Sequence, residues 1–261
     1  MAYKMKKHLA HRINYGSNRK TSEIKYIVIH YTAGDGDSDE GNTNYFAKPL
    51  ERKASAHYFV DDDSITQSVP DDYVAYSVGG SKYTDCAKTG GGKLYQIATN
   101  RNTLNIEMCD SIKDGTIKAQ EATIINTIKF VRKKMKQYNI DIDHVIRHFD
   151  VNGKHCPAYL MNEDDWRIFK DRIIGFQTGT VYHTTRSCVL RSSPGVSDNK
   201  VLYKEVNGSV LKKCIRSGQY VRFDGAFKLI DVSIIGNDIW GKMKSGYWIP
   251  LKYHGVIRAI K

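Results

Sequence analysis

The residues best suited to chemistry gather in one short stretch, Arg147 to Pro157, which contains two histidines, an aspartate, a lysine and a cysteine. It follows a β-branched run, His144 to Arg147, that is typical of a short strand. Zinc prefers imidazole nitrogen and thiolate sulfur in tetrahedral geometry, and a catalytic zinc leaves its fourth position for water. Three ligands drawn from His30, His148 and Cys156 would meet that requirement.

Each of these residues also has a structural interpretation. His30 lies near the end of an apolar run and precedes a glycine-containing loop, and the carboxyl end of a strand is where folds tend to present functional side chains. However, most buried histidines are structural and have a satisfied hydrogen bond. The stretch after Arg147 could equally be an ordinary loop with an oxidisable surface cysteine. His144 and His148 would lie about 13 Å apart in a strand, so they are not expected to pair.

Glu107 is the one acid of a strand-like segment, Thr103 to Cys109, in which polar and apolar residues alternate. A carboxylate is costly to bury unless it is paired or functional. Glu107 is therefore either a structural partner for an arginine or a functional acid, and its position alone leaves both open.

The strands that must position these residues fall in a first region, residues 1–175. The run Tyr26 to Tyr31 is continuously β-branched and aromatic, which predicts a strand buried on both faces. Residues 56–60 and 64–69 predict a hairpin around the three aspartates at 61–63. The glycine-rich residues 77–92 predict a long loop.

Two helices are predicted in the same region. Between Ala119 and Tyr138, apolar residues recur at spacings of four and three and form one buried stripe. We expect the basic residues of this helix to form a solvated face: Lys129, Arg132, Lys133, Lys134 and Lys136. The second helix begins after Asn162, a suitable N-cap, and has three acids in its first turn. Its buried stripe consists of Trp166, Phe169 and Ile173.

A second region, residues 176–261, begins after the segment Gly175 to Gly179 and contains short strand-like runs separated by Gly, Pro, Asn and Asp. Residues 227–234 alternate with period two, and residues 238–243 and 246–251 are two further runs joined by a short turn. This pattern predicts a small antiparallel barrel.

The net charge of +12 is concentrated in the second region. Residues 1–175 carry 26 Lys and Arg against 23 Asp and Glu, whereas residues 176–261 carry 14 against 5. A cationic region attached to a nearly neutral one indicates a polyanionic partner, which could be nucleic acid, an anionic membrane surface or an anionic cell wall. A solvated surface without a partner is the alternative.

Length and composition narrow the class of protein. The 261 residues suit one large domain or two modest ones, and 41% hydrophobic residues exclude wholesale disorder. The five cysteines are widely spaced and form no CxxC pair, which argues against a disulfide framework and a four-cysteine zinc site. No apolar run is long enough to span a membrane or to form a secretory signal, so we expect synthesis in the cytoplasm.

Four segments carry a family resemblance: Ile27 to Gly34 (IVIHYTAG), Ser55 to Asp61 (SAHYFVD), Asn105 to Cys109 (NIEMC), and Arg147 to Pro157, where RHFDV is followed after four residues by CP. In this order they resemble the zinc-dependent N-acetylmuramoyl-L-alanine amidases, especially the phage and prophage endolysin branch of the family that includes peptidoglycan-recognition proteins. The resemblance implies an α/β amidase domain over residues 1–175, with a central mixed sheet flanked by helices.

The same resemblance implies roles for individual residues. Zinc would be bound by His30, His148 and Cys156. Glu107 matches the acid that serves as general base or positions the water, and Lys154 matches the cation that stabilises the tetrahedral oxyanion. His57 lies where many relatives have a catalytic or substrate-contacting tyrosine, which predicts a substrate-binding role. The bond cleaved would join N-acetylmuramic acid to L-alanine in peptidoglycan.

In the second region, Cys188 to Gly195 and Ile239 to Ile249 resemble a bacterial SH3-like domain. Such domains commonly anchor lysins to cell walls, so the resemblance implies that residues 176–261 form a small all-β cell-wall-binding domain. Its excess positive charge would attract teichoic-acid phosphates.

Two other functions compete with a wall hydrolase. A binding-only peptidoglycan-recognition protein typically lacks the cysteine ligand, whereas Cys156 is present. A nucleic-acid-binding protein would explain the charge but not the combination of His30, His148 and Cys156. We therefore expect a phage or prophage endolysin or an autolysin that lyses Gram-positive walls after release from the cytoplasm. It is expected to be a monomer that binds no nucleic acid.

Overall fold

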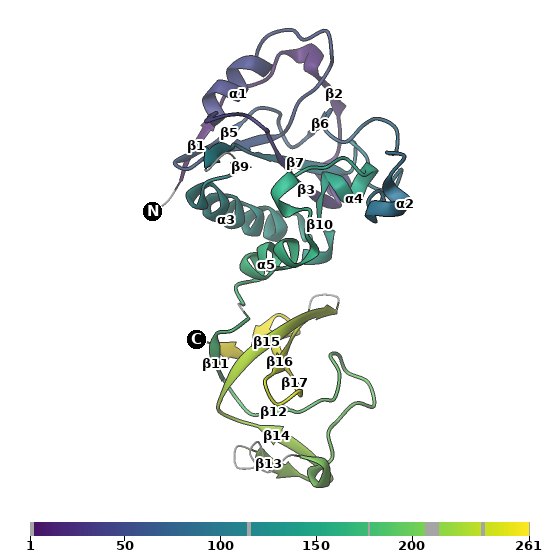
Figure 1. Ribbon diagram of the computed structural model, residues 1–261, viewed down its shortest axis with the longest axis vertical. Coiled ribbons are helices and arrows are strands. Elements are labelled where there is room, and N and C mark those ends of the chain that lie inside the picture. The colour runs from purple at the N-terminus through teal and green to yellow at the C-terminus, as the bar shows by residue number, and fades with distance from the viewer. Residues whose placement is uncertain (1–2, 114–115, 177, 207–213, 236–237, 261) are drawn as a thin grey trace. The chain divides into compact units, whose positions relative to one another are not determined.

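The computed structural model describes residues 3–113, 116–176, 178–206, 214–235 and 238–260. The chain divides into two compact units, Met1–Ile173 and Ile174–Lys261, which are seen in Figure 1. Each unit has its own buried apolar residues.

A six-stranded mixed sheet forms the centre of the N-terminal unit. The strands of this unit are β1 (Lys4–Lys7), β2 (Tyr15–Asn18), β3 (Tyr26–Tyr31), β4 (Tyr58–Val60), β5 (Ser64–Gln67), β6 (Tyr73–Ala75), β7 (Thr103–Met108), β8 (Ser111–Lys113), β9 (Thr116–Lys118) and β10 (Val145–Arg147). The order in the sheet is β1-β5-β4-β7-β3-β10, and β4, β7, β3 and β10 run parallel. β4 and β5 form the predicted antiparallel hairpin.

The helices of this unit are α1 (Asp39–Phe46), α2 (Cys86–Thr89), α3 (Glu121–Tyr138), α4 (His148–Asn152) and α5 (Glu163–Ile174). Short 3-10 helices cover Arg12–Asn14, Thr21–Glu23, Ile142–His144 and Ala158–Leu160, and one more covers Tyr203–Glu205 in the C-terminal unit. Among the described residues, no helix combines the length and the apolar character needed to cross a membrane.

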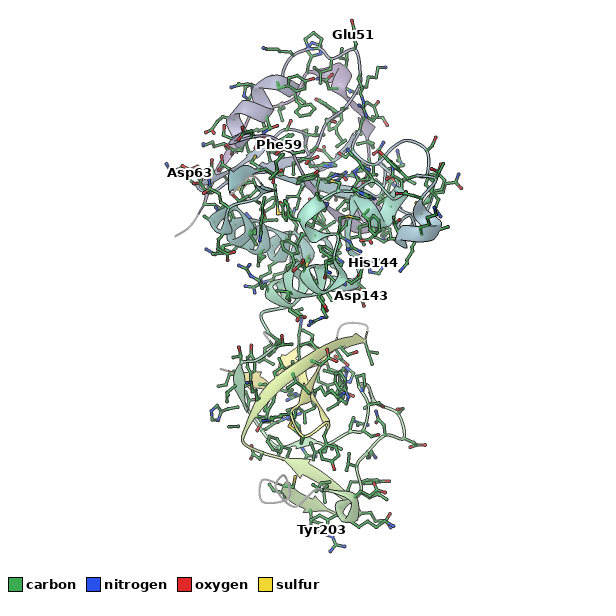
Figure 2. All side chains as sticks on the ribbon, viewed as in Figure 1. Glu51, Phe59, Asp63, Asp143, His144 and Tyr203 are labelled. Atoms are coloured by element: carbon green, nitrogen blue, oxygen red, sulfur yellow. The ribbon has the colours of Figure 1, made fainter. Side chains whose placement is uncertain are left out.

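Helices cover the two faces of the sheet, and neighbouring residues of β4 show which helix lies on which face. The Phe59 ring stacks on Phe46 at the end of α1, with 5.3 Å between centroids. The adjacent Tyr58 points the other way and lies 4.6 Å from Phe130 of α3. α1 and α3 therefore lie on opposite faces (Figure 1), and Phe59 is labelled within this unit in Figure 2. The alternation follows from the period of two in a strand.

The two predicted helices are confirmed, with one exception on the surface of α3. The Asn162 side chain accepts a hydrogen bond from the backbone of Asp164 at 2.8 Å, which is the predicted N-cap of α5. Lys134 was expected in the solvated face of α3 but is only 6% exposed. Its ammonium group is paired with Asp71 and donates to the Tyr58 hydroxyl at 2.8 Å. Burial is tolerated because the charge is paired.

Apart from the 3-10 helix Tyr203–Glu205, the regular elements described in the C-terminal unit are strands, as the alternating sequence predicts. They are β11 (Val181–Thr184), β12 (Cys188–Val189), β13 (Cys214–Ser217), β14 (Tyr220–Phe223), β15 (Ala226–Ile235), β16 (Asp238–Met243), β17 (Trp248–Tyr253), β18 (Val256–Ile257) and β19 (Ala259–Ile260). One sheet has the order β18-β17-β16-β15-β11-β19 and the other β12-β14-β13. Tyr203 lies near β13 and β14 (Figure 2), under the Arg216 guanidinium.

Candidate metal centre and catalytic groove

Two histidines and a cysteine that are far apart in the sequence meet at one point of the N-terminal unit. One donor atom from each of His30, His148 and Cys156 lies within 4.8 Å of the others. The two imidazole rings are 4.8 Å apart between centroids, and the Cys156 sulfur is 3.8 Å from Nδ1 of His30. All three side chains are buried. The structure thus brings together the three residues that the family resemblance suggests as zinc ligands.

The parallel strands explain why these residues meet. His30 and Glu107 occupy paired register positions near the carboxyl ends of β3 and β7, and His148 immediately follows β10. Because these three strands are parallel neighbours, their carboxyl ends lie at the same edge of the sheet. That edge is the usual place for a site in an open parallel sheet.

Local hydrogen bonds hold His148 and Cys156 in place. α4 begins at His148 because the Asp150 carboxylate accepts from the backbone N–H of Arg147 at 2.8 Å and from its guanidinium at 2.8 Å. The chain then turns back, so that the Cys156 carbonyl accepts from the backbone N–H of Phe149 at 3.1 Å. This bond ties the cysteine to the first turn of α4.

A chain of hydrogen bonds fixes the orientation of the His30 ring. Nε2 of His30 lies 3.1 Å from the Asn105 side-chain oxygen, which can only accept. The Asn105 amide is itself oriented, because its nitrogen donates to the Thr103 hydroxyl at 3.1 Å and that hydroxyl donates to the Thr99 carbonyl at 2.9 Å. Nε2 of His30 therefore carries the proton, and the Nδ1 lone pair faces Cys156. A metal-binding histidine typically donates the N–H of its other ring nitrogen to a fixed acceptor in this way.

His148 provides the observation that tests whether a metal ion fits here. Both of its ring nitrogens are buried and have no hydrogen-bond partner within the described ranges. A buried polar atom without a hydrogen-bond partner destabilises the fold, so such atoms are rare unless they bind something else. Burial lowers the pKa of His148 to about 2 and that of His30 to about 3, so both rings are neutral as ligation requires. Two neutral imidazoles and a thiol are a donor set that suits zinc.

Glu107 lies beside this cluster and is partly open to solvent. Its Oε1 is 3.8 Å from Nδ1 of His30, and 19% of its side chain is exposed. Oε2 has no hydrogen-bond partner in the part of the chain that the structure describes. Burial raises the pKa of the Glu107 carboxyl to about 8, against the lowering effect of the Lys154 charge. The carboxyl group is thus poised for proton transfer near neutral pH.

A groove of about 880 Å³ opens onto Glu107, His148 and Lys154. Its lining includes three further cations and three aromatic rings: Arg52, Lys53, Lys82, Phe46, Tyr76 and Tyr83. Of the described residues that line this groove, Glu107 is the only acid. The arrangement joins a potential metal centre, a proton-transfer group and a cation in one accessible space.

Residues 20–159, more than half of the chain, match the family model described as N-acetylmuramoyl-L-alanine amidase. The chain belongs to this amidase family. His30, Glu107, His148 and Cys156 all lie inside the residues that match the family model.

Individual relatives agree with this family membership. A probable N-acetylmuramoyl-L-alanine amidase of Bacillus licheniformis is 33% identical over 203 residues, which cover 74% of this chain and 53% of the relative. The chain spans about half the length of the curated relatives it matches. The catalytic domain of PlyG is 27% identical with a TM-score of 0.51, over 66% of this chain and 93% of that domain. A mutant endolysin from Bacillus subtilis shares the fold at 24% identity and a TM-score of 0.50, over 66% and 99%.

His57, for which the family resemblance predicts a substrate contact, is not among the described residues that line this groove. It is fully buried. Its Nδ1 accepts from the backbone N–H of Asn105 at 3.0 Å, and its Nε2 lies 3.1 Å from the Tyr73 carbonyl. Burial, and then the charge of Arg19, lower the pKa of His57 to about 3. The ring is thus a neutral structural link between β7 and β6.

Asn105 is a site residue that sequence reasoning missed, because a neutral amide attracts no attention as a chemical group. A signal was nevertheless present. Thr103, Asn105 and Glu107 are polar at alternate positions of β7, so all three face the same side of the sheet. A polar row on one side of an otherwise apolar strand indicates a buried hydrogen-bond network.

Proposed function

We propose that the chain is a zinc-dependent hydrolase that cleaves the amide bond between N-acetylmuramic acid and L-alanine in peptidoglycan. The observation that carries this proposal is the meeting of His30, His148 and Cys156 beside Glu107 on an open groove. Membership of the amidase family supports the choice of bond.

His30, His148 and Cys156 would hold the zinc ion. The unpartnered nitrogens of His148 and the oriented Nδ1 of His30 support this assignment. When bound, zinc supplies a Lewis acid that polarises a carbonyl group and lowers the pKa of water. Burial raises the pKa of the Cys156 thiol, and a nearby dication would reverse this effect and favour the thiolate.

Glu107 and Lys154 would carry out the remaining chemistry. Glu107 would accept a proton from the attacking water and return it to the leaving nitrogen of L-alanine. The water oxygen would first bond to the lactyl carbonyl carbon, and the C–N bond would then break, which gives a carboxylic acid on the glycan and a free amine on the peptide. The Lys154 ammonium lines the same groove and would stabilise the oxyanion that forms in between.

We further infer that the C-terminal unit is an SH3-like module that holds the enzyme on an anionic Gram-positive wall. Its two sheets, its excess of positive charge and the two SH3-like segments at 188–195 and 239–249 support this interpretation. The enzyme would act as a monomer on the wall after release from the cell, as a phage or prophage endolysin or an autolysin.

The proposal is tested by digesting purified Gram-positive walls. The wild-type protein should lower turbidity and release new L-alanine amino termini. The matched variant Glu107→Gln should do neither at a comparable rate. Lysis that releases reducing sugars without new amino termini would contradict the proposal, because that pattern indicates cleavage of the glycan.

A further inference from the structure

The C-terminal unit contains a pocket of about 180 Å³ that the amidase chemistry does not use. It lies where β12 and the residues before it meet β14, β16 and β17. Its lining combines four arginines with two aromatic rings, a cysteine and small or apolar residues: Arg186, Arg191, Arg222, Arg258, Trp240, Tyr253, Cys188, Ser187, Val189, Val196 and Pro250.

Arginine, and not positive charge in general, is concentrated at this pocket. The C-terminal unit has five arginines and nine lysines. Four of the five arginines line the pocket, whereas none of the lysines that the structure describes in this unit does. A guanidinium group presents a planar fork of donors that matches the oxygens of a phosphate or carboxylate, which a lysine ammonium does not. The concentration of arginines at the pocket therefore indicates specific binding of an oxyanion, in addition to the general electrostatic attraction of anions to this unit.

Two of the four arginines are occupied by the protein itself. Arg191 donates to the Asn199 side chain at 2.6 Å and to the Ser197 carbonyl at 3.2 Å. Arg222 donates to the hydroxyl and the carbonyl of Ser187, at 3.0 and 2.6 Å. These two guanidinium groups are held rigidly and contribute positive potential to the pocket.

The other two arginines retain their donors. Within residues 3–113, 116–176, 178–206, 214–235 and 238–260, the guanidinium groups of Arg186 and Arg258 form no hydrogen bond or ion pair. Their backbones are nonetheless fixed side by side, because the Arg258 carbonyl accepts from the backbone N–H of Thr185 at 2.8 Å. Burial raises the pKa of the nearby Cys188 thiol, and the charges of Arg258, Arg222 and Arg186 all oppose that rise. The positive charges of Arg186, Arg222 and Arg258 therefore all lie close to the Cys188 thiol in the lining of the pocket.

We propose that this pocket binds a phosphate group of an anionic cell-wall polymer through the Arg186 and Arg258 guanidinium groups. The proposal rests on the proposed role of the C-terminal unit as a wall anchor and assigns that role to a defined site. The pocket is too small for a peptide stem or a sugar chain but suits a single charged group. A phosphodiester recurs along such a polymer, so the pocket would bind any of many repeats.

The test compares two double variants of the full chain that lose the same charge. Arg186→Gln with Arg258→Gln removes the free donors of the pocket. Lys204→Gln with Lys244→Gln removes two exposed lysines of the same unit that do not line it. Co-sedimentation with purified Gram-positive walls should show at least about a 10-fold weaker affinity for the arginine variant, since hydrogen bonds to charged groups are the strong ones. The lysine variant should stay within about threefold of wild type.

Walls stripped of their phosphate polymers, and inorganic phosphate as a competitor, identify the ligand. On stripped walls the wild type and the arginine variant should bind equally. Inorganic phosphate should displace the wild type from intact walls more strongly than sodium chloride of equal ionic strength does. Equal losses in the two double variants, an arginine variant that binds like wild type, or displacement that depends on ionic strength alone would overturn the proposal.

Hydrolysis of a soluble muramoyl-peptide fragment, measured on the same preparations, separates this proposal from the proposed function. All variants should cleave the fragment at the wild-type rate, and their thermal unfolding should show that both double variants are folded. Failure of the wild type to cleave it would refute the amidase assignment but would leave the phosphate-binding result standing.

Discussion

The hydrogen bond between His30 and Asn105 should strengthen zinc binding, and its length and burial set the expected magnitude. Asn105→Leu removes the acceptor of the Nε2 proton and fills the space, so that water has no room to replace the amide. The bond is 3.1 Å long, Asn105 is fully buried and His30 is 2% exposed. A buried donor left without a partner costs about 1–3 kcal/mol. Loss of the outer partner of a metal-binding histidine weakens metal binding by about 10- to 100-fold.

We expect the zinc affinity of Asn105→Leu to fall toward the upper end of that range, because burial prevents solvent from compensating. The assay is a titration of the metal-free protein with zinc in the presence of a competing chelator. The matched control is Asn126→Leu, which removes another buried amide of the same unit that bonds the carbonyls of Asp61 and Asp62. Both variants should lose stability, but only Asn105→Leu should lose zinc affinity. Equal zinc affinity in the two variants would refute the positioning role of Asn105.

Three further predictions concern the N-terminal unit. Glu107→Gln should retain zinc but lose about 10²- to 10⁴-fold in turnover of a muramoyl-peptide fragment; a rate within a few-fold of wild type would show that Glu107 is not the proton-transfer group. His57→Phe should lower the unfolding free energy by about 1–3 kcal/mol, because a backbone donor loses its partner, yet leave KM within about twofold; a large rise in KM would restore a substrate-contacting role. Burial alone would raise the pKa of Asp71, but the Lys134 charge and the hydrogen bonds to the carboxylate outweigh burial and lower the pKa. The ionised Asp71 carboxylate therefore contributes its full stabilisation of the fold above the unfolded pKa of about 3.9. This contribution is lost as the pH falls further. Asp71→Asn should therefore cost about 3 kcal/mol in denaturant unfolding at pH 7 and clearly less at pH 3, and an equal cost at both pH values would contradict this.

Sequence patterns could predict the elements because their causes are local. The apolar run of β3, the apolar stripe of α3 and the N-cap of α5 each depend on residues that are close to one another in the sequence. Residue types nominated the three residues of the candidate metal centre, but only the family resemblance assigned them as a ligand set. His30 and Cys156 are separated by 126 positions, and residue spacing alone left the choice of ligands open.

Lys134 and His57 are polar groups whose surroundings are set by segments distant in the sequence. Lys134 fits a solvated helix face by periodicity, but Asp71 supplies a charge partner inside the unit. His57 is predicted to contact substrate by the family resemblance, whereas in the structure β6 and β7 enclose its ring and both of its nitrogens lie within hydrogen-bond distance of their backbones. The periodicity of a helix or strand predicts which side of the element a residue occupies. It does not predict which residues of other segments pack against that side.

We propose above all that His30, His148 and Cys156 together hold one zinc ion that hydrolysis requires. The most direct measurement is the zinc content and amidase activity of the chelator-treated protein as zinc is added back, for the wild type and for Cys156→Ser. The expected result is that wild-type activity, measured as new L-alanine amino termini, returns in step with one bound zinc per chain, whereas Cys156→Ser binds zinc far more weakly. Full activity in the metal-free protein, or unchanged zinc binding in Cys156→Ser, would contradict it.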